Sequence, residues 1–213
     1  YGFSVAVDDE AEFVQLLDDY FSKNKTPGTN VMLFDIMHAQ ADFQHTHEVV
    51  ITVSIDTMSD NFSPSSFDEA WGEFRLKVSK LITPGFQAIG QRFMKFGDDS
   101  KEYPYQLVNT VSFDMENRRK WNRMVRKLRT KYPRTKSAFA TWHISIGGHD
   151  NSNTWILQSF QSYKDFLTAW NDGQTFRKNN PEFDEEQTKM NEEIDYSEFE
   201  LKLRFMRLLL KQW

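Results

Sequence analysis

At the start of the chain the spacing of hydrophobic residues changes from every second position, as in a strand, to the three- and four-residue spacing of a helix. Over residues 2–7 they occupy every second position, which predicts a strand with one buried face that ends with Val5 and Val7. Asp8 is the expected cap of a helix that stops at residues 25–28. The apolar face of this helix, at helical spacing, consists of Phe13, Leu16, Leu17, Tyr20 and Phe21.

A hairpin, a second helix and a strand follow. Residues 30–37 and 47–55 are rich in β-forming residues and are joined by a polar turn, which predicts an antiparallel hairpin. A helix is expected from a cap at Ser66 to a stop at 83–85, and residues 86–96 are expected to close the unit as a strand. The apolar face of this helix consists of Phe67, Ala70, Trp71, Phe74 and Val78. The order of elements is β-α-β-β-α-β.

The second half of the chain repeats this order. SVAVD at residues 4–8 aligns with TVSFD at 110–114, and SFDEAW at 66–71 is echoed by SYKDFLTAW at 162–170. The expected elements are a strand at 105–113, a helix capped by Asp114 that ends at Pro133, a hairpin of strands at 137–146 and 154–160, a helix from Ser162 and an alternating strand at 199–205.

Two copies of one unit are therefore expected, over residues 1–97 and 104–213. Each β-α-β-β-α-β unit is predicted to form a ferredoxin-like antiparallel sheet with two helices on one face. The bare face of each sheet needs a cover, and two such sheets in one chain can cover each other. The predicted fold class is α+β, with two tandem ferredoxin-like repeats forming a pseudo-dimeric α/β barrel.

One stretch of the second half carries a family resemblance. A strand that ends in LQSF at 157–160 leads into the helix SYKDFLTAW, and Phe176 follows six residues later. This pattern resembles the dimeric α/β barrel superfamily, particularly its antibiotic-biosynthesis monooxygenase-like group, most clearly over residues 105–205. The resemblance implies a ligand pocket within the barrel or between a sheet and its helices. It also implies oxygenase or haem chemistry, without deciding between them.

The resemblance assigns roles to two further residues. Trp170 falls where haem-degrading members carry a ring near the cofactor, but those members also place a His after this Trp, and RKNNPEF at 177–183 contains none. Cofactor-independent oxygenases of the group use Asn, Trp and Arg to position the substrate, which suggests Asn109 for this role. The alternatives are a structural hydrogen bond for Asn109 and a place in the core for Trp142.

His143 is the candidate acid or base. It lies in ATWHISI, where we expect Trp142, Ile144 and Ile146 to face the helices and His143 to face the barrel. In this hypothesis His143 deprotonates the substrate, Asn109 positions it and Arg204 stabilises the anion. Substrate-binding side chains are expected to be Trp170, Glu200, Lys202, Thr110 and Ser112. The alternative is a structural hydrogen-bond network between two sheets.

Three histidines bracket the first hairpin turn, HAQADFQHTH. If the turn is centred between Ala41 and Asp42, His38 lies opposite His45, and His47 shares their face. Three imidazoles with Asp42 nearby could bind zinc or another divalent metal. The alternative is an exposed turn whose histidines are solvated.

Composition narrows the choice of partner. The chain of 213 residues has a net charge of -5, 19 Phe and no Cys, so disulfides, thiolate catalysis and Cys-based metal sites are excluded. No apolar run reaches the length of a membrane span. The basic stretch at 118–136 is balanced by an acidic one at 181–200, and the two could dock against each other or against a partner.

The sequence thus predicts a monooxygenase-like protein that acts on an aromatic or polycyclic small molecule in a barrel cavity. No tightly bound organic cofactor is expected, with haem or a divalent metal as alternatives, and neither nucleic acid nor membrane as partner. The protein would be a monomeric pseudo-dimer or a homodimer. The alternatives are a non-catalytic small-molecule or haem-binding module and a structural repeat protein. The first residue is Tyr1 rather than Met, so a cytoplasmic location and export after signal removal both remain open.

Overall fold

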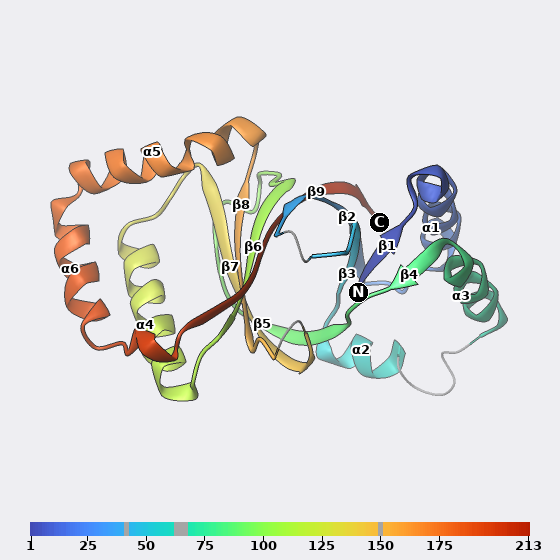
Figure 1. Cartoon of the computed structure of the whole chain (residues 1–213), viewed down its shortest axis with the longest axis horizontal. Helices are drawn as coiled ribbons and strands as arrows, with labels where there is room; N and C mark the ends of the chain where they lie inside the picture. The colour runs from blue at the N-terminus through green and yellow to red at the C-terminus, as the bar shows by residue number, and fades with distance from the viewer. Residues whose placement is uncertain (41–42, 62–67, 149–150) are drawn as a thin grey trace. The chain divides into compact units, whose positions relative to one another are not determined.

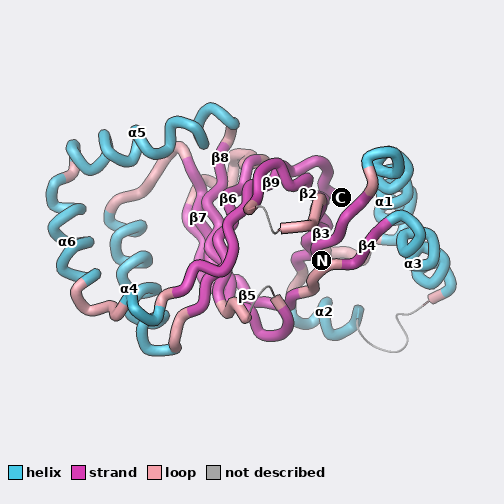
Figure 2. Tube along the Cα trace, in the orientation of Figure 1, coloured by secondary structure: helices cyan, strands magenta, loops and turns pink. Residues whose placement is uncertain are grey.

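The computed structural model describes residues 1–40, 43–61, 68–148 and 151–213. It divides into two compact units. Unit 1 comprises residues 1–37, 41–87 and 208–213, and unit 2 comprises residues 38–40 and 88–207. Helices and strands alternate in both units (Figures 1 and 2), which confirms the α+β class. None of the helices in these described ranges is long and apolar enough to cross a membrane.

Unit 1 contains an antiparallel sheet with the strand order β4-β1-β3-β2-β9, in which β9 contributes its C-terminal end. The predicted hairpin is confirmed, because β2 pairs antiparallel with β3. The elements are β1 (Gly2–Val5), α1 (Glu10–Asn24), β2 (Asn30–Ala39), β3 (His47–Thr52), α2 (Ile55–Asn61), α3 (Glu69–Leu81) and β4 (Ile82–Pro84).

Aromatic rings hold α1 and α3 together in unit 1. Tyr20 of α1 stacks on Phe74 of α3 with ring centroids 4.2 Å apart, and Phe21 meets Phe74 edge to face at 5.6 Å. Phe13 and Leu17 of α1 are buried in the same core with Phe3 and Val5 of β1. The apolar faces predicted for these helices are therefore the faces that pack.

Several local expectations for unit 1 need correction. Val7 is 86% exposed, because the chain leaves β1 after Val5 and turns through a short 3₁₀ helix, η1 (Val7–Asp9). The residue at the N-cap of α1 is Asp9, not Asp8. The cap of α3 is Asp68, which accepts a hydrogen bond from the Trp71 N–H. The expected cap Ser66 lies outside the described residues, as does Phe67, and the sequence patterns did not indicate α2.

Unit 2 contains five strands in the order β9-β6-β8-β7-β5, with three helices on one side of the sheet (Figure 1). The hairpin of β7 and β8 and the strand β6 are confirmed. The elements are β5 (Ala88–Phe96), β6 (Tyr105–Ser112), α4 (Met115–Lys131), β7 (Ser137–Gly147), β8 (Thr154–Phe160), α5 (Tyr163–Asn179), α6 (Pro181–Asn191), a 3₁₀ turn η3 (Tyr196–Glu198) and β9 (Glu200–Gln212).

The predicted cap Asp114 is confirmed, and Ser162 caps the helix that was expected from this residue. Asp114 accepts hydrogen bonds from the N–H groups of Glu116 and Asn117, and Ser162 accepts one from the N–H of Asp165. Both side chains satisfy backbone donors that the first helical turn leaves without partners.

The acidic stretch forms a helix, α6, which the sequence analysis did not predict. Pro181 begins it, and Phe183 is buried against Met124 and Leu128 of α4. Glu186 of α6 pairs with Lys131 of α4 and lies 3.7 Å from Lys127. Of the two interpretations of the charged stretches, docking against each other is the one that the structure supports.

Strand β5 departs from the expected repeat. Residues 86–96 were expected to close the sheet of the first repeat, but β5 pairs antiparallel with β7 of unit 2. In unit 1 the strand beside β1 is β4, which pairs Val5 with Ile82, where the sequence analysis expected only a helix stop. The division into repeats at residues 97 and 104, and their closure into a barrel, stay predictions.

The contrast between Val5 and Val7 gives a direct test of the core of unit 1. Val5→Ala should lower the free energy of unfolding by about 2 kcal/mol, because it removes two buried methyl groups and leaves a cavity. Val7→Ala should change it by less than about 0.5 kcal/mol, because the side chain is exposed. Urea denaturation of both variants measures the difference, and equal costs would contradict the observed end of β1.

Candidate functional site

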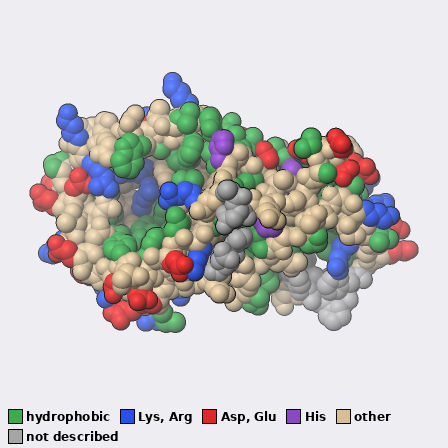
Figure 3. Space-filling model, viewed as in Figure 1, with side chains coloured by type: hydrophobic (Ala, Val, Ile, Leu, Met, Phe, Trp, Pro, Cys, Tyr) green, Lys and Arg blue, Asp and Glu red, His purple; other side chains and the backbone are tan. Residues whose placement is uncertain are grey.

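A half-open pocket of about 540 Å³ lies between α4 and the strands β5 and β7 of unit 2. We call it the His143 pocket. Its wall combines four arginines with one imidazole, one amide and two apolar side chains, and no carboxylate. The lining residues are Phe93, Met115, Arg118, Arg119, Asn122, Arg123, Arg126 and His143. Figure 3 shows Lys and Arg side chains around a hollow in the surface that unit 2 forms.

The rotation of α4 directs its arginines to this pocket. Met124 and Leu128 are buried on one side of the helix, against Phe183 of α6. At about 100° per residue, Arg119 and Arg126 lie on the opposite side. No carboxylate among the described residues pairs with the four arginines that line the pocket, whereas Lys120 pairs with Glu116 at 2.8 Å. The arginines are therefore available to an anionic ligand.

A bulge in β5 supplies the aromatic wall. Arg92 pairs with Trp142 and Met94 with Thr141, so Phe93 is an extra residue between two successive pairs. Its ring stacks on the imidazole of His143, with centroids 4.5 Å apart and planes at 15°. The Arg126 guanidinium lies 5.3 Å from the centre of the Phe93 ring. The bulge thus places a ring that a regular ladder would direct elsewhere.

The surroundings of His143 favour its neutral form. Burial lowers the pKa of His143 below its ordinary value, and the positive charge of Arg118 lowers this pKa further. The side-chain amide of Asn122 lies 3.4 Å from Nε2 of the imidazole. Asn122 can donate to Nε2 only when this nitrogen carries no proton, as in one neutral tautomer. A neutral imidazole can accept a proton from a ligand in the pocket.

The orientation of His143 corrects an expectation. It was predicted to face a barrel interior with Thr110 and Ser112, but it faces α4. In β7 the residues that face α4 are Phe139, which contacts Trp121, and the positions in step with it, Thr141 and His143. The apolar pattern misled because Ile146, assigned to the helix-facing side, is 68% exposed.

Thr110 and Ser112 lie on the other face of the sheet. Thr110 pairs with Trp155, and Trp155 pairs with Trp142, so Thr110 shares a face with Trp142 rather than with His143. Ser112 follows Thr110 by two residues and has the same orientation. These two side chains do not line the His143 pocket.

The structure brings together two other predicted site residues, Asn109 and Arg204. Nε of Arg204 donates a hydrogen bond of 2.6 Å to Oδ1 of Asn109, between β9 and β6. Asn109 is in register with Ile156 and Thr141, so it shares a sheet face with His143. Two strand spacings and two residues separate their Cα atoms by about 12 Å. The pair is therefore not in contact with His143.

The remaining predicted binding residues lie elsewhere. Trp170 is 76% exposed on α5. Lys202 pairs with Glu200 at 2.6 Å within β9, and neither lines the pocket. Glu200, the one carboxylate among the predicted binding residues, is thus not part of the His143 pocket. Their roles in binding a substrate stay predictions.

The hairpin histidines do not form the expected cluster. Asp35 pairs with His47, and the Ile36 N–H donates to the Thr46 carbonyl, so continuing this register pairs residue 37 with His45. The sequence analysis expected His38 opposite His45. Because the observed register differs by one residue, the His38 side chain lies on the opposite face of the strand from the residue that pairs with His45. In the described part of the chain no group of three His, Asp or Glu side chains could hold a metal. Asp42 lies outside that part.

Each hairpin histidine has neighbours of its own. His47 is buried between Phe3 and Phe13, and its Nδ1 lies 2.8 Å from Oγ1 of Thr46. Nε2 of His38 lies 3.1 Å from the hydroxyl of Tyr163. The ring of His45 contacts Phe86 with centroids 5.3 Å apart. Each imidazole is thus held by its own local contacts.

Comparison with known proteins supports the fold. A protein from Fusobacterium nucleatum subsp. nucleatum, provisionally named a monooxygenase, is similar over 99% of this chain and 90% of its own, with a TM-score of 0.53 and 15% identity. A second provisionally named monooxygenase, from Lactobacillus acidophilus, is similar over 98% and 90%, with a TM-score of 0.55 and 12% identity. The chain has a monooxygenase-like fold. No family model and no curated protein matches it.

The sequence analysis missed the arginines and the bulge of this monooxygenase-like fold. The signal for the arginines was present, because Arg119, Arg123 and Arg126 follow the i, i+4, i+7 spacing of one helix face. The basic stretch was interpreted as one that docks against the acidic stretch or against a partner. The bulge at Phe93 has no comparable signal, because it depends on pairing with a distant strand.

The pKa of His143 is the first test of this site. Nuclear magnetic resonance titration should give a value below 6.5, its ordinary value. Arg118→Gln should raise this pKa only in part, because burial is the larger cause. A value at or above 6.5, or no response to Arg118→Gln, would contradict the arrangement.

The lowered pKa also predicts a pH dependence of stability. The folded state binds the His143 proton less tightly than the unfolded chain, so the stability linked to it is fully present above pH 6.5 and declines as the pH falls below that value. His143→Gln should remove this component of the decline, which urea denaturation at several pH values measures. His38→Gln is the matched control and should retain the component.

Proposed function

We propose that the protein is a monooxygenase-like enzyme that oxidises an anionic aromatic small molecule in the His143 pocket, without a tightly bound organic cofactor. The observation that carries this proposal is the environment of His143. Its imidazole, with a lowered pKa, lies in a wall that contains four arginines and no carboxylate. This arrangement suits a reaction in which a substrate loses a proton and the resulting anion is stabilised.

The pocket supports an aromatic acid or phenol as ligand. Its volume of about 540 Å³ lies within the range of small-molecule sites and suits two or three fused rings. Met115 is largely exposed and offers apolar surface, while the guanidinium groups offer forked donors for a carboxylate or phenolate. The pocket favours an anionic aromatic ligand over an uncharged apolar one, because an uncharged ligand would leave the four arginines without a counterion.

In the proposed reaction, His143 accepts the phenolic proton. The electron-rich phenolate then passes electrons to O₂, so the substrate is oxidised and O₂ is reduced. For an anthrone-type substrate, whose ring CH₂ forms this phenol by tautomerisation, the balance is CH₂ + O₂ → C=O + H₂O. One oxygen atom enters the carbonyl group, and the other leaves as water with both methylene hydrogens, one of which His143 has accepted and returned. The arginines stabilise the phenolate and the reduced oxygen species.

Asn109 and Arg204 have a different part in this proposal from the one first expected. They are hydrogen-bonded to each other, and the Cα atoms of Asn109 and His143 are about 12 Å apart, so the pair cannot position a small substrate at the imidazole. The α4 arginines take over the stabilisation of the anion. Asn109 and Arg204 would meet only the far end of a polycyclic substrate.

The scaffold of the proposed enzyme is the pseudo-dimeric barrel of two ferredoxin-like repeats in one monomer. The solved structures that support a monooxygenase-like fold match nearly the whole chain. A second candidate function is a non-catalytic binding module that uses the same pocket. The half-open form of the pocket favours this candidate, because water reaches the ligand site in the free protein.

Oxygen uptake distinguishes the two functions. Hydroxynaphthoic acids and anthrone-type phenols should raise the melting temperature of the protein, and an enzyme should consume the anthrone-type phenols together with O₂. His143→Gln should lower kcat by roughly 10²- to 10⁴-fold, which is the usual loss when a general base is removed. Arg123→Gln should raise KM. His38→Gln, on a histidine outside the pocket, is the matched control.

Each outcome of these experiments supports or excludes a different part of the proposal. A rise in melting temperature without O₂ uptake would favour the binding module. Uptake that His143→Gln leaves unchanged would remove His143 from the mechanism. If none of these compounds raises the melting temperature or is consumed with O₂, the proposed ligand class is wrong.

A further inference from the structure

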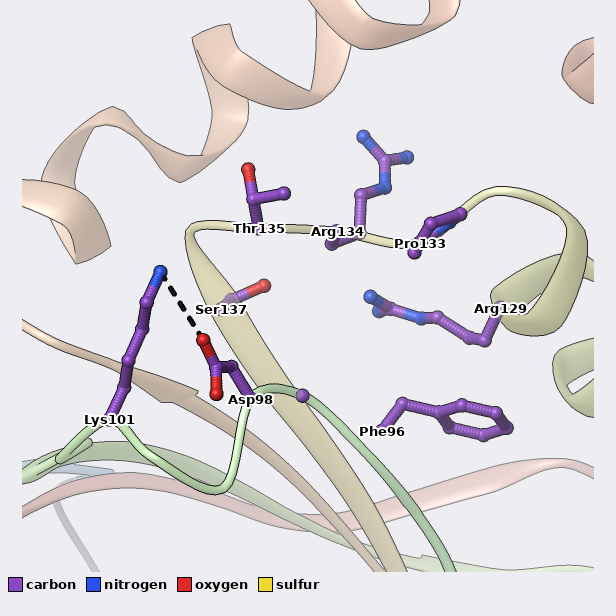
Figure 4. A pocket seen from close by; sticks show the side chains of 9 residues that line it. Phe96, Asp98, Lys101, Arg129, Pro133, Arg134, Thr135 and Ser137 are labelled. Carbon is purple, nitrogen blue, oxygen red and sulfur yellow. Dashed lines mark ion pairs between the residues drawn. The ribbon is translucent and has the colours of Figure 1, made fainter.

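We propose that a second pocket, at the C-terminal end of α4, binds the phosphate dianion of a small phosphorylated molecule. This pocket, which we call the Arg129 pocket, has a volume of about 280 Å³ and shares no lining residue with the His143 pocket. Its polar wall contains Lys101, Arg129, Arg134, Thr135 and Ser137 (Figure 4). The proposal does not depend on the proposed oxygenase function.

Two chain reversals build the Arg129 pocket. Pro133, Arg134 and Thr135 lie in the connection between α4 and β7, and Ser137 begins β7. On the opposite side, β5 ends at Phe96 and turns at Gly97, which has φ +143°. A Cβ at this glycine would lie 2.7 Å from Cβ of Ala138. Only glycine therefore allows this turn to pass so close to β7.

The charges of the Arg129 pocket are not balanced within the protein. In the described residues no carboxylate lies within ion-pair distance of Arg129 or Arg134. The lining carboxylate, Asp98, lies 3.9 Å from Nζ of Lys101 and accepts hydrogen bonds from Ser100. Three cations and one carboxylate leave an excess of two positive charges. A dianion would neutralise this excess.

Aromatic rings hold both guanidinium groups. Arg129 lies 4.7 Å from the ring centre of Phe139, and Arg134 lies 3.1 Å from that of Phe176. A ring face beside a guanidinium favours its charged form. In Figure 4 the Arg129 guanidinium and the Ser137 hydroxyl point toward each other across the pocket.

Burial and repulsion by neighbouring arginines destabilise the charged forms of Arg129 and Arg134. Burial lowers the pKa of Arg129 to about 10, and the charge of Arg134 adds to this effect. Burial likewise lowers the pKa of Arg134 to about 10, with a contribution from Arg177. Both groups remain charged at neutral pH. A bound anion would reverse both effects, because it replaces lost hydration and offsets the repulsion.

Phosphate suits this wall better than a carboxylate does. A phosphate presents three or four oxygens, which can accept from the Arg129 guanidinium, the Lys101 ammonium and the Ser137 hydroxyl together. The C-terminal end of α4 opposes an anion with roughly half a negative charge, which is smaller than the excess of two positive charges. The volume admits a phosphate with a small substituent.

Titration with inorganic phosphate at constant ionic strength tests the proposal. Binding should be saturable by calorimetry and should raise the melting temperature relative to a chloride reference. Arg129→Gln and Lys101→Gln should each weaken binding by about tenfold or more, since each removes a charge-assisted hydrogen-bond donor. Arg123→Gln removes the same charge from the same helix but lies in the other pocket, so its effect should stay within about twofold.

Three results would overturn the assignment. Loss of binding in Arg123→Gln but not in Arg129→Gln would place the phosphate in the His143 pocket. Equal losses in both variants, or no saturation beyond the chloride reference, would reduce the effect to charge screening. If Arg129→Gln fails to fold, Lys101→Gln decides, because Lys101 is exposed in the loop after β5. No aromatic substrate is present, so failure here is independent of the oxygen-uptake result.

Discussion

The burial of Met124 and Leu128 fixes the rotation of α4, and both pockets depend on that rotation. These residues pack against Phe183 of α6, which gives the helix one apolar side. Arg126, two positions from Met124, and Arg119 and Arg129, five positions from it, then turn away from α6 toward the pockets. A rotation by one residue would bury an arginine and break the core. The apolar contact with α6 therefore fixes the directions in which the arginines of α4 point.

Charge is distributed unevenly within unit 2, although the whole chain carries a net charge of -5. The acidic helix α6 pairs with the lysines of α4, through Glu186, and with Arg177 of α5, through Asp184 at 2.8 Å. Within the described residues, its carboxylates form no ion pair with the arginines that line the two pockets. The basic stretch is thus neutralised where it packs on α6 and left unneutralised where it faces a cavity. If α4 were only a solvated helix, there would be no reason for its paired lysines and its pocket-lining arginines to lie on different sides.

The sequence predicted the local elements of unit 2 well, because their signals are local. The caps at Asp114 and Ser162 depend on a side chain and backbone groups within one helical turn. The hairpin of β7 and β8 depends on two alternating runs and a turn. The strand β5 and its bulge at Phe93 could not be predicted in this way, because the partner of β5 lies about fifty residues away in the sequence.

The site residues were harder to predict because each depends on the face of a strand. His143 was identified as a candidate base, but its orientation was inferred from apolar neighbours near the exposed end of β7, where Ile146 meets solvent. The three hairpin histidines depended on a turn centre, and a difference of one residue separated His38 from the others. Residue types were easier to identify than the surfaces on which they lie.

The two pockets lie on one helix, which raises the question of whether ligands in them would influence each other. Arg126 and Arg129 are one turn apart on α4. Two unit charges about 10 Å apart in water interact by about 0.4 kcal/mol, which changes an affinity by roughly twofold. Stronger coupling would require α4 to move, and its contact with Phe183 and Ile194 resists such motion. Direct electrostatics alone therefore leaves the two sites nearly independent, so a large coupling between them would indicate a displacement of α4.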